Sequence, residues 1–254
     1  MIVDTHTHAI LEENNNDRAD FEILIGHTLK EAKNAIKQAK IHKHVFATCG
    51  LYPHDIKPED EIPDEKKLLE IEILAKNEKV VGIGECGLDF TKPKLPEIKR
   101  TKKKQIKLFT SQINLAKKLN LPIIIHSRLA TEELFIVLKQ ESPFQSVWHC
   151  FTENYITAKK ALDLGLMLSI TGIITYANAN DLRDAVKKIP LENIMLETDS
   201  PYLVPQKAKD KGVKVNSSKY VRLIAQEIAG IKGISQKKVE DITSKNAFDF
   251  FKLS

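Results

Sequence analysis

Short apolar runs alternate with longer amphipathic segments along most of the chain. The runs are continuously apolar, which is typical of parallel strands covered on both faces rather than of strands with one face in water. Strands are expected at Ile2–Thr7, Phe21–Gly26, His44–Gly50, Val80–Glu85, Pro122–His126, Ser146–His149, Met167–Thr171 and Ile194–Glu197.

The segments between these runs have the apolar spacing of helices. Phe109, Ile113 and Ala116, for example, recur at the interval of one helix face. Helices are expected at Lys30–Lys40, Lys66–Lys76, Thr101–Leu119, Lys219–Ala229 and Ser235–Phe251.

Parallel strands that alternate with helices predict an α/β protein, and eight of them predict a TIM-type (β/α)8 barrel. The 254 residues match the size of one such barrel, so we expect a single domain over residues 1–254. A doubly wound open sheet is the structural alternative. Only Ala9–Asp20 separate the first two strands, which predicts a short first crossover with a very short helix or a loop in its place.

Composition adds little beyond a soluble globular class. The net charge of +5 permits a polyanionic partner without requiring one. The three cysteines, Cys49, Cys86 and Cys150, are far apart and lack the spacing of a disulfide framework, which fits a reducing compartment. No apolar run approaches the ~18 residues of a membrane span. We therefore expect a cytoplasmic protein without a membrane partner, and a monomer because no heptad pattern calls for a second chain.

Candidate metal ligands stand where the predicted strands end. In Asp4-Thr5-His6-Thr7-His8, the residues at alternate positions share one strand face, so His6 and His8 point the same way. The other candidates, at the ends of the predicted fourth, fifth, sixth and eighth strands, are Glu85, His126, His149 and Asp199. Barrel enzymes build their sites at these carboxyl ends. One such histidine alone is more often a core residue, but residues from several strands meet in one place if a barrel closes.

Four imidazoles and two carboxylates suit Zn²⁺, Mn²⁺ or Co²⁺, and Mg²⁺ is less natural with this much nitrogen. Six ligands exceed the need of one open catalytic metal, whereas two divalent metal ions about 3.5–4 Å apart would use them all. Glu85, central in the order, is the expected bridge, and Asp199 is the expected general base for a metal-activated water. Asp4 is either a residue that orients a ligand or a simple strand-end polar residue.

The same residues lie in longer strings that resemble the TatD family of metal-dependent deoxyribonucleases. The strings are Val3–His8, Gly84–Asp89, Ile125–Arg128, His149–Phe151 and Leu196–Tyr202, and they follow one another in the family's order over almost the whole chain. The resemblance implies a metallo-dependent hydrolase-like barrel with His6, His8, Glu85, His126, His149 and Asp199 as ligands of Mg²⁺, Mn²⁺ or Zn²⁺. It also implies DNA as substrate, single-stranded more than double-stranded, with cleavage from 3′ to 5′.

Several positions depart from the family pattern. Tyr52 stands where the family usually has His, although His54 two residues later remains. Thr152–Asn154 replaces a usual Ser-Gly pair, and the loop after Pro205 keeps only Asn216 of a usual Arg-Asn-x-Pro. None of these changes touches the six ligands. They bear on the substrate more than on the chemistry.

Substrate contacts are expected from Arg128 and His54. Arg128 shares the side of His126 and could hold a phosphate by two parallel hydrogen bonds, with a structural ion pair as the alternative. His54 follows the third strand and could contact substrate, with a solvated loop position as the alternative. The basic run Lys99–Lys104 could follow a nucleic-acid backbone, although most such runs are solvated helix faces.

Two other functions compete with a nuclease. One is a hydrolase of another ester or amide bond, either an aminoacyl-tRNA deacylase or a barrel amidohydrolase. Two-metal amidohydrolases often carry a bridging lysine at the fourth strand, so Glu85 favours the nuclease-like group. The other is a non-catalytic nucleic-acid-binding protein with a vestigial site, which the presence of all six ligands argues against.

Overall fold

The structure is a computed structural model that describes residues 1–8, 18–56, 62–93, 97–142 and 145–253. The chain forms two compact units. Unit 1 combines Met1–Leu24 with His149–Ser254, and unit 2 is Ile25–Trp148. In the described residues, no helix combines the length and the apolar character that crossing a membrane requires.

Four parallel strands form the centre of unit 1. Strand β1 (Val3–Thr7) pairs with β2 (Phe21–Leu24), and β9 (Met167–Ile170) pairs with β10 (Ile194–Leu196). A parallel bridge between Thr7 and Ser200 joins β1 to the segment that follows β10. The carboxyl ends of β1 and β10 therefore lie side by side.

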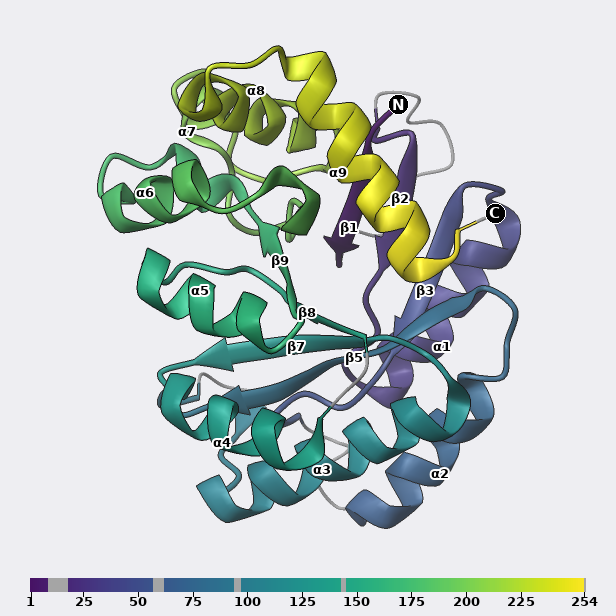
Figure 1. Ribbon diagram of the computed structural model, residues 1–254. Helices are drawn as coiled ribbons and strands as arrows, with labels where there is room; N and C mark the ends of the chain where they lie inside the picture. The colour runs from purple at the N-terminus through teal and green to yellow at the C-terminus, as the bar shows by residue number, and fades with distance from the viewer. Residues whose placement is uncertain (9–17, 57–61, 94–96, 143–144, 254) are drawn as a thin grey trace. The chain divides into compact units, whose positions relative to one another are not determined.

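Helices cover these strands. They are α5 (Tyr155–Asp163), α6 (Asn180–Lys188), the single turn α7 (Gln206–Lys209), α8 (Val221–Lys232) and α9 (Gln236–Phe251). Helix α9 packs against β10 and β1, and α8 packs against α9 and α6 (Figure 1). On α9, Val239, Thr243 and Ala247 are buried at intervals of four residues, which places them on one face of the helix.

Unit 2 contains four more parallel strands. The order is β3 (Val45–Cys49), β5 (Val80–Asp89), β7 (Ile123–Arg128) and β8 (Ser146–Trp148), each hydrogen-bonded to the next. Two short strands, β4 (Asp55–Ile56) and β6 (Glu97–Ile98), pair antiparallel beside them. The helices are α1 (Leu29–Ile41), α2 (Asp64–Leu74), α3 (Lys102–Leu119) and α4 (Thr131–Glu141).

Helix α3 packs along β5, and its neighbours α2 and α4 lie on either side of it (Figure 1). Phe109, Ile113 and Ala116 are buried, as predicted. Gln112, which the apolar pattern did not single out, is equally buried: its side-chain amide accepts a hydrogen bond from the Leu51 nitrogen at 2.7 Å and donates one to the Leu51 oxygen at 3.0 Å. This bond pair fixes the segment after β3 against α3.

Each predicted strand is present, but two are longer than expected. Strand β5 continues past Glu85 to Asp89, so Glu85 lies inside the strand rather than at its end. Gly84 and Gly87 allow this extension because both have positive φ, at 138° and 142°. Strand β7 likewise runs two residues beyond His126. The prediction of a short first crossover falls largely on residues 9–17, outside the described residues.

Candidate functional site

Unit 1 brings four of the predicted ligands together. Strand β1 places His6 in its interior and His8 directly after it, with 3.2 Å between their Nε2 atoms. Oδ1 of Asp199 lies 3.7 Å from Nε2 of His6 and 3.4 Å from Nε2 of His8. The rings of His6 and His149 stack with centroids 3.7 Å apart. One ligand atom each from His6, His149 and Asp199 lies within 4.8 Å of the others. Such a nitrogen and oxygen donor set fits a borderline divalent cation.

The backbone around Asp199 explains how these side chains meet. The Asp199 nitrogen donates to the His6 oxygen at 2.9 Å, and the His8 nitrogen donates to the Ser200 oxygen at 2.7 Å. Asp199 itself has φ of 55°, a left-handed conformation that aspartate tolerates better than most residues. These two bonds continue the pairing of the β1 and β10 segments beyond the ends of the strands. Backbone hydrogen bonds therefore fix the positions of both segments that carry the proposed ligands.

Asp4 holds the backbone next to the ligand segments by hydrogen bonds. Its side chain is fully buried and accepts hydrogen bonds from the Thr198 nitrogen at 2.8 Å, from the Thr198 hydroxyl and from the His6 nitrogen at 3.3 Å. Burial raises the pKa of Asp4 well above its usual value, and the Thr198 and His6 hydrogen bonds oppose that rise. The sequence left open whether Asp4 orients a ligand, and these bonds place it between the His6 and Asp199 segments.

Glu197 is a residue that the sequence interpretation missed. It is buried, and its Oε1 lies 2.9 Å from Nδ1 of His149 and accepts a hydrogen bond from the Cys150 nitrogen at 2.6 Å. A carboxylate on one imidazole nitrogen orients the ring and leaves the other nitrogen for a metal. The signal was available, because a glutamate at the end of a predicted buried strand is unusual unless it has a partner.

Unit 2 holds the other two predicted ligands. Nδ1 of His126 lies 2.7 Å from Oε1 of Glu85, and Nε2 of His126 lies 3.2 Å from Oδ2 of Asp89. Tyr52 donates its hydroxyl proton to the same Asp89 oxygen at 2.9 Å. Asp89 ends the segment Gly84–Asp89, which resembles the family, but the sequence alone assigned it no role. Its position at the end of β5 makes it the centre of this cluster.

Asp89 also contacts His54. Nε2 of His54 lies 3.8 Å from Oδ1 of Asp89, and its ring is buried, so the alternative of a solvated loop histidine is wrong. Burial alone would raise the pKa of Asp89, but hydrogen bonds with His126 and Thr91, together with the nearby His54, outweigh it and hold the pKa well below the usual value. Asp89 is therefore a carboxylate at neutral pH.

The remaining sequence predictions are distributed over the surface and the loops. Arg128 is exposed at the end of β7. Asn154 of the altered loop caps α5 by accepting from the Thr157 nitrogen at 3.0 Å, and Asn216 donates to the Thr198 oxygen at 2.9 Å. Asn154 of the altered loop and Asn216, the residue of the family pattern that is kept, therefore both have structural roles. Cys86 is buried against the Ile124 carbonyl, so its side chain packs between β5 and β7.

Arg100 corrects the interpretation of the basic run. Its side chain is 4% exposed and forms ion pairs with Asp55 and Asp64 of unit 2. A guanidinium committed to two carboxylates does not face solvent, so the run is not a continuous cationic strip.

Comparisons with known proteins place the chain in a family. The family model described as TatD related DNase matches residues 3–252. An uncharacterized metal-dependent hydrolase, YabD of Bacillus subtilis, is 33% identical over 100% of this chain and 100% of its own length. The 3′-5′ ssDNA/RNA exonuclease TatD of Salmonella typhimurium is 31% identical over 91% of this chain and 87% of its own length.

Solved structures confirm the fold class. The crystal structure of YjjV, a TatD homologue from Escherichia coli K12, matches with a TM-score of 0.86 at 22% identity and covers 100% of this chain and 98% of that one. The predicted TIM-type (β/α)8 class is therefore correct, and the doubly wound alternative is not needed.

Proposed function

We propose, because the chain belongs to the TatD family of metal-dependent hydrolases, that it hydrolyses phosphodiester bonds and shortens single-stranded DNA from its 3′ end. The observation that carries the hydrolytic part is the unit 1 cluster, with His6, His149 and Asp199 in reach of one cation. The name of the Salmonella relative, which includes both single-stranded DNA and RNA, supports a nucleic-acid substrate. We propose that residues 1–254 act as one hydrolase domain.

The proposed metal ligands are the six residues expected from the sequence. Unit 1 supplies His6, His8, His149 and Asp199, and unit 2 supplies Glu85 and His126. Two divalent ions, Mg²⁺, Mn²⁺ or Zn²⁺, are the proposed cofactors. Such ions acidify a water molecule and neutralise the charge of a phosphate when they are bound.

The protein's own residues position the reaction. Asp199 is the proposed general base, since its carboxylate is 16% exposed and lies against His6 and His8, where it can accept a proton from water. Glu197 holds the His149 ring in one orientation. Asp4 fixes the backbone on both sides of the cluster through the bonds to Thr198 and His6.

Arg128 and His54 are proposed to act on the substrate, Arg128 by direct contact and His54 through Asp89. The exposed guanidinium of Arg128 can pair with two oxygens of one phosphate. His54 is covered in the structure and touches Asp89, so its proposed contribution passes through that carboxylate.

The test is a time course on 5′-labelled single-stranded DNA with Mg²⁺ or Mn²⁺. The wild-type protein should give a ladder that shortens from the 3′ end. A chelator should abolish it, and Asp199→Asn should do the same with far-ultraviolet circular dichroism unchanged. Asp181→Asn, the same change on exposed α6, is the matched control and should cleave normally.

Two outcomes would contradict the proposal. Full activity of Asp199→Asn would remove Asp199 from the mechanism. Intact DNA after incubation with a protein shown by elemental analysis to hold metal would exclude the nuclease and leave the hydrolase, with aminoacyl-tRNA and small amides as the next substrates.

A further inference from the structure

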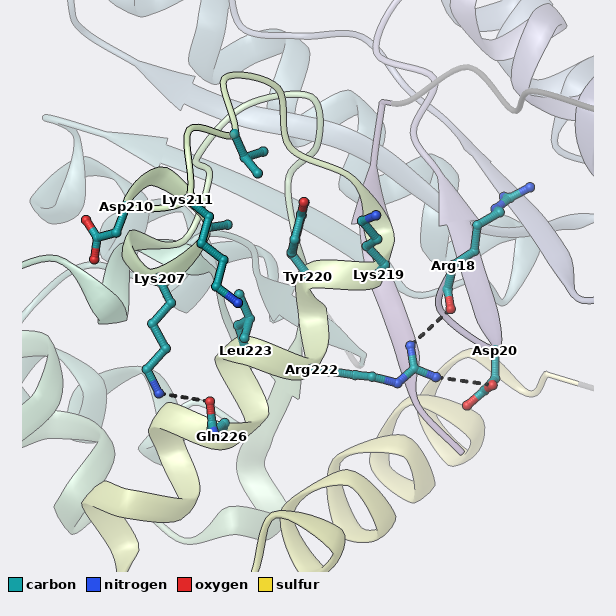
Figure 2. A pocket seen from close by; sticks show the side chains of 12 residues that line it. Arg18, Asp20, Lys207, Asp210, Lys211, Lys219, Tyr220, Arg222, Leu223 and Gln226 are labelled. Carbon is teal, nitrogen blue, oxygen red and sulfur yellow. Dashed lines mark hydrogen bonds and ion pairs between the residues drawn. The ribbon is translucent and has the colours of Figure 1, made fainter. Parts of the chain in front are cut away.

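A groove of 870 Å³ opens on unit 1, and its lining includes none of the six proposed ligands. Three segments form it: the residues before β2, α7 with the loop that follows it, and the start of α8 (Figure 2). Its positive side chains are Arg18, Lys207, Lys211, Lys219 and Arg222. Its negative ones are Asp20 and Asp210. The lining is therefore cationic by a margin of three formal charges.

The two arginines are already neutralised by acidic neighbours. Arg18 forms a two-pronged pair with Glu22, with Nε 2.8 Å from Oε1, and Arg222 lies 3.4 Å from Asp20. These pairs build the wall of the groove that Figure 2 shows around Arg222 and Asp20. The arginines are structural, so a ligand would have to meet the lysines.

Lys207 and Lys211 are the two lysines of α7 and its following loop that line the groove. Nζ of Lys207 donates to the neutral amide of Gln226 at 2.9 Å (Figure 2). Neither lysine forms an ion pair with a carboxylate among the residues that the structure describes, and both are exposed. The nearby Asp210 accepts from Gln206 rather than from a lysine, at 2.8 Å. Two exposed ammonium groups on one groove attract an anion.

An aromatic ring lies in the same groove. Tyr220 lines it, and Nζ of Lys219 is 5.2 Å from the centre of the Tyr220 ring. A cationic groove that also presents aromatic rings is the arrangement that binds single-stranded nucleic acid, since the backbone meets the charges and a base stacks on the ring.

The groove is connected to the unit 1 cluster by a short, fixed segment. Asn216 donates to the carbonyl oxygen of Thr198, the residue before Asp199. Ser218 donates to Glu22, and Lys219 follows directly. Three residues span at most about 10 Å, so the Lys219 backbone lies within about that distance of the Asn216 backbone. The Asn216 side chain reaches from there to the Thr198 carbonyl oxygen.

We propose that the basic groove, defined by Lys207, Lys211, Lys219 and Tyr220, binds the phosphate backbone of a single strand whose 3′ end is at the candidate site. This inference rests on the proposed nucleic-acid substrate and adds where the strand lies beyond the cleaved bond. The groove is a binding surface and takes no part in bond cleavage.

Binding tests the groove without depending on turnover. The probe is a fluorescent oligo(dT) of about 20 nucleotides, long enough for one single-strand binding site. It is titrated against the Asp199→Asn protein at several salt concentrations by fluorescence anisotropy. Adding Lys207→Gln, Lys211→Gln and Lys219→Gln should weaken binding at least about tenfold and reduce the slope of log K against log salt by about 2, or about 0.7 per lost phosphate contact. Lys211→Gln alone should reduce the slope by about 0.7.

A second triple variant is the matched control. Lys159, Lys237 and Lys245 are exposed on α5 and α9, each paired with an aspartate four residues later. Changing these three to Gln removes the same charge from unit 1 but should leave both affinity and salt slope unchanged. If both triple variants weaken oligo(dT) binding equally, the proposal for the groove is wrong, because net charge would then explain the binding. The melting temperatures of both triples should match that of the parent.

Failure of the groove differs from failure of the nuclease. If wild-type protein leaves DNA intact but the groove triple variant binds oligo(dT) less tightly than the control triple variant, the proposed binding groove is confirmed and the proposed nuclease activity is wrong. If DNA is shortened but the two triple variants bind oligo(dT) with the same affinity, the proposed nuclease activity is confirmed and the proposed binding groove is wrong.

Discussion

At the scale of single residues, the orientation of His149 depends on one carboxylate. Its Nδ1 faces Glu197 at 2.9 Å, and the same oxygen of Glu197 accepts from the Cys150 nitrogen. A buried carboxylate with these partners selects one ring orientation, and a histidine selected in this way binds metal more tightly than a rotating one. Glu197 therefore influences the site without being one of the proposed ligands.

We expect Glu197→Ala to weaken metal binding by about 10- to 100-fold. Glu197→Gln keeps an acceptor oxygen for the ring and should lose less. The affinity for Zn²⁺ or Mn²⁺ is measured by competition with a chromophoric chelator, and Glu192→Ala, on the exposed part of the turn Leu191–Asn193, is the control. Unchanged affinity in Glu197→Ala would remove this carboxylate from the site.

At the scale of elements, one buried guanidinium ties α2 to the segment after β3. Arg100 pairs with Asp64 at 2.7 Å and with Asp55, and it donates to the Tyr52 oxygen at 3.0 Å. Lys67 on α2 also reaches Asp55 at 2.7 Å. Removing one partner of a buried pair is costly because the others lose their compensating charge.

Arg100→Ala should therefore lower the free energy of unfolding by about 3 kcal/mol, toward the range for a broken buried pair. Lys103→Ala, on the exposed face of the same basic run, should change it by no more than about 0.5 kcal/mol. Urea denaturation followed by circular dichroism measures both. Equal free energies of unfolding for Arg100→Ala and Lys103→Ala would mean that the Arg100 ion pairs contribute nothing to stability. Arg100 would then again be a candidate for nucleic-acid binding.

The elements also show what the sequence could and could not predict. The strands were predicted because continuous apolar runs have few alternatives in a chain of this type. The extension of β5 beyond Glu85 was not predicted, because Gly84 and Gly87, which allow it, interrupt the apolar run and indicate the end of a strand. The β4–β6 pair was missed since two-residue strands carry no period. The six proposed ligands could be named from the predicted strand ends, whereas the contacts of Glu197 and Asp89 with the histidines are visible only in the folded chain, between segments distant in sequence.

At the scale of the whole molecule, metal binding and stability are linked. The proposed unit 1 ligands come from three distant parts of the chain: the end of β1, the residue after β8 and the segment after β10. An unfolded chain does not keep these groups together, so a cation binds the native state far more tightly. A ligand present at about 100 times its dissociation constant stabilises the native state by about 2.7 kcal/mol.

Removal of metal should therefore lower the melting temperature of the protein by about 5–10 °C, since 1 kcal/mol corresponds to about 2–4 °C in a chain of this size. Differential scanning calorimetry compares the metal-loaded protein, the same sample with excess chelator, and that sample after Mn²⁺ or Zn²⁺ is restored. His149→Ala should show a much smaller difference between the first two, because it lacks a proposed ligand. Lys159→Ala, exposed on α5, should behave as wild type. A wild-type protein that holds metal by elemental analysis but melts at one temperature with and without chelator would show that the ions bind outside the folded clusters, and the ligand assignment would fail with it.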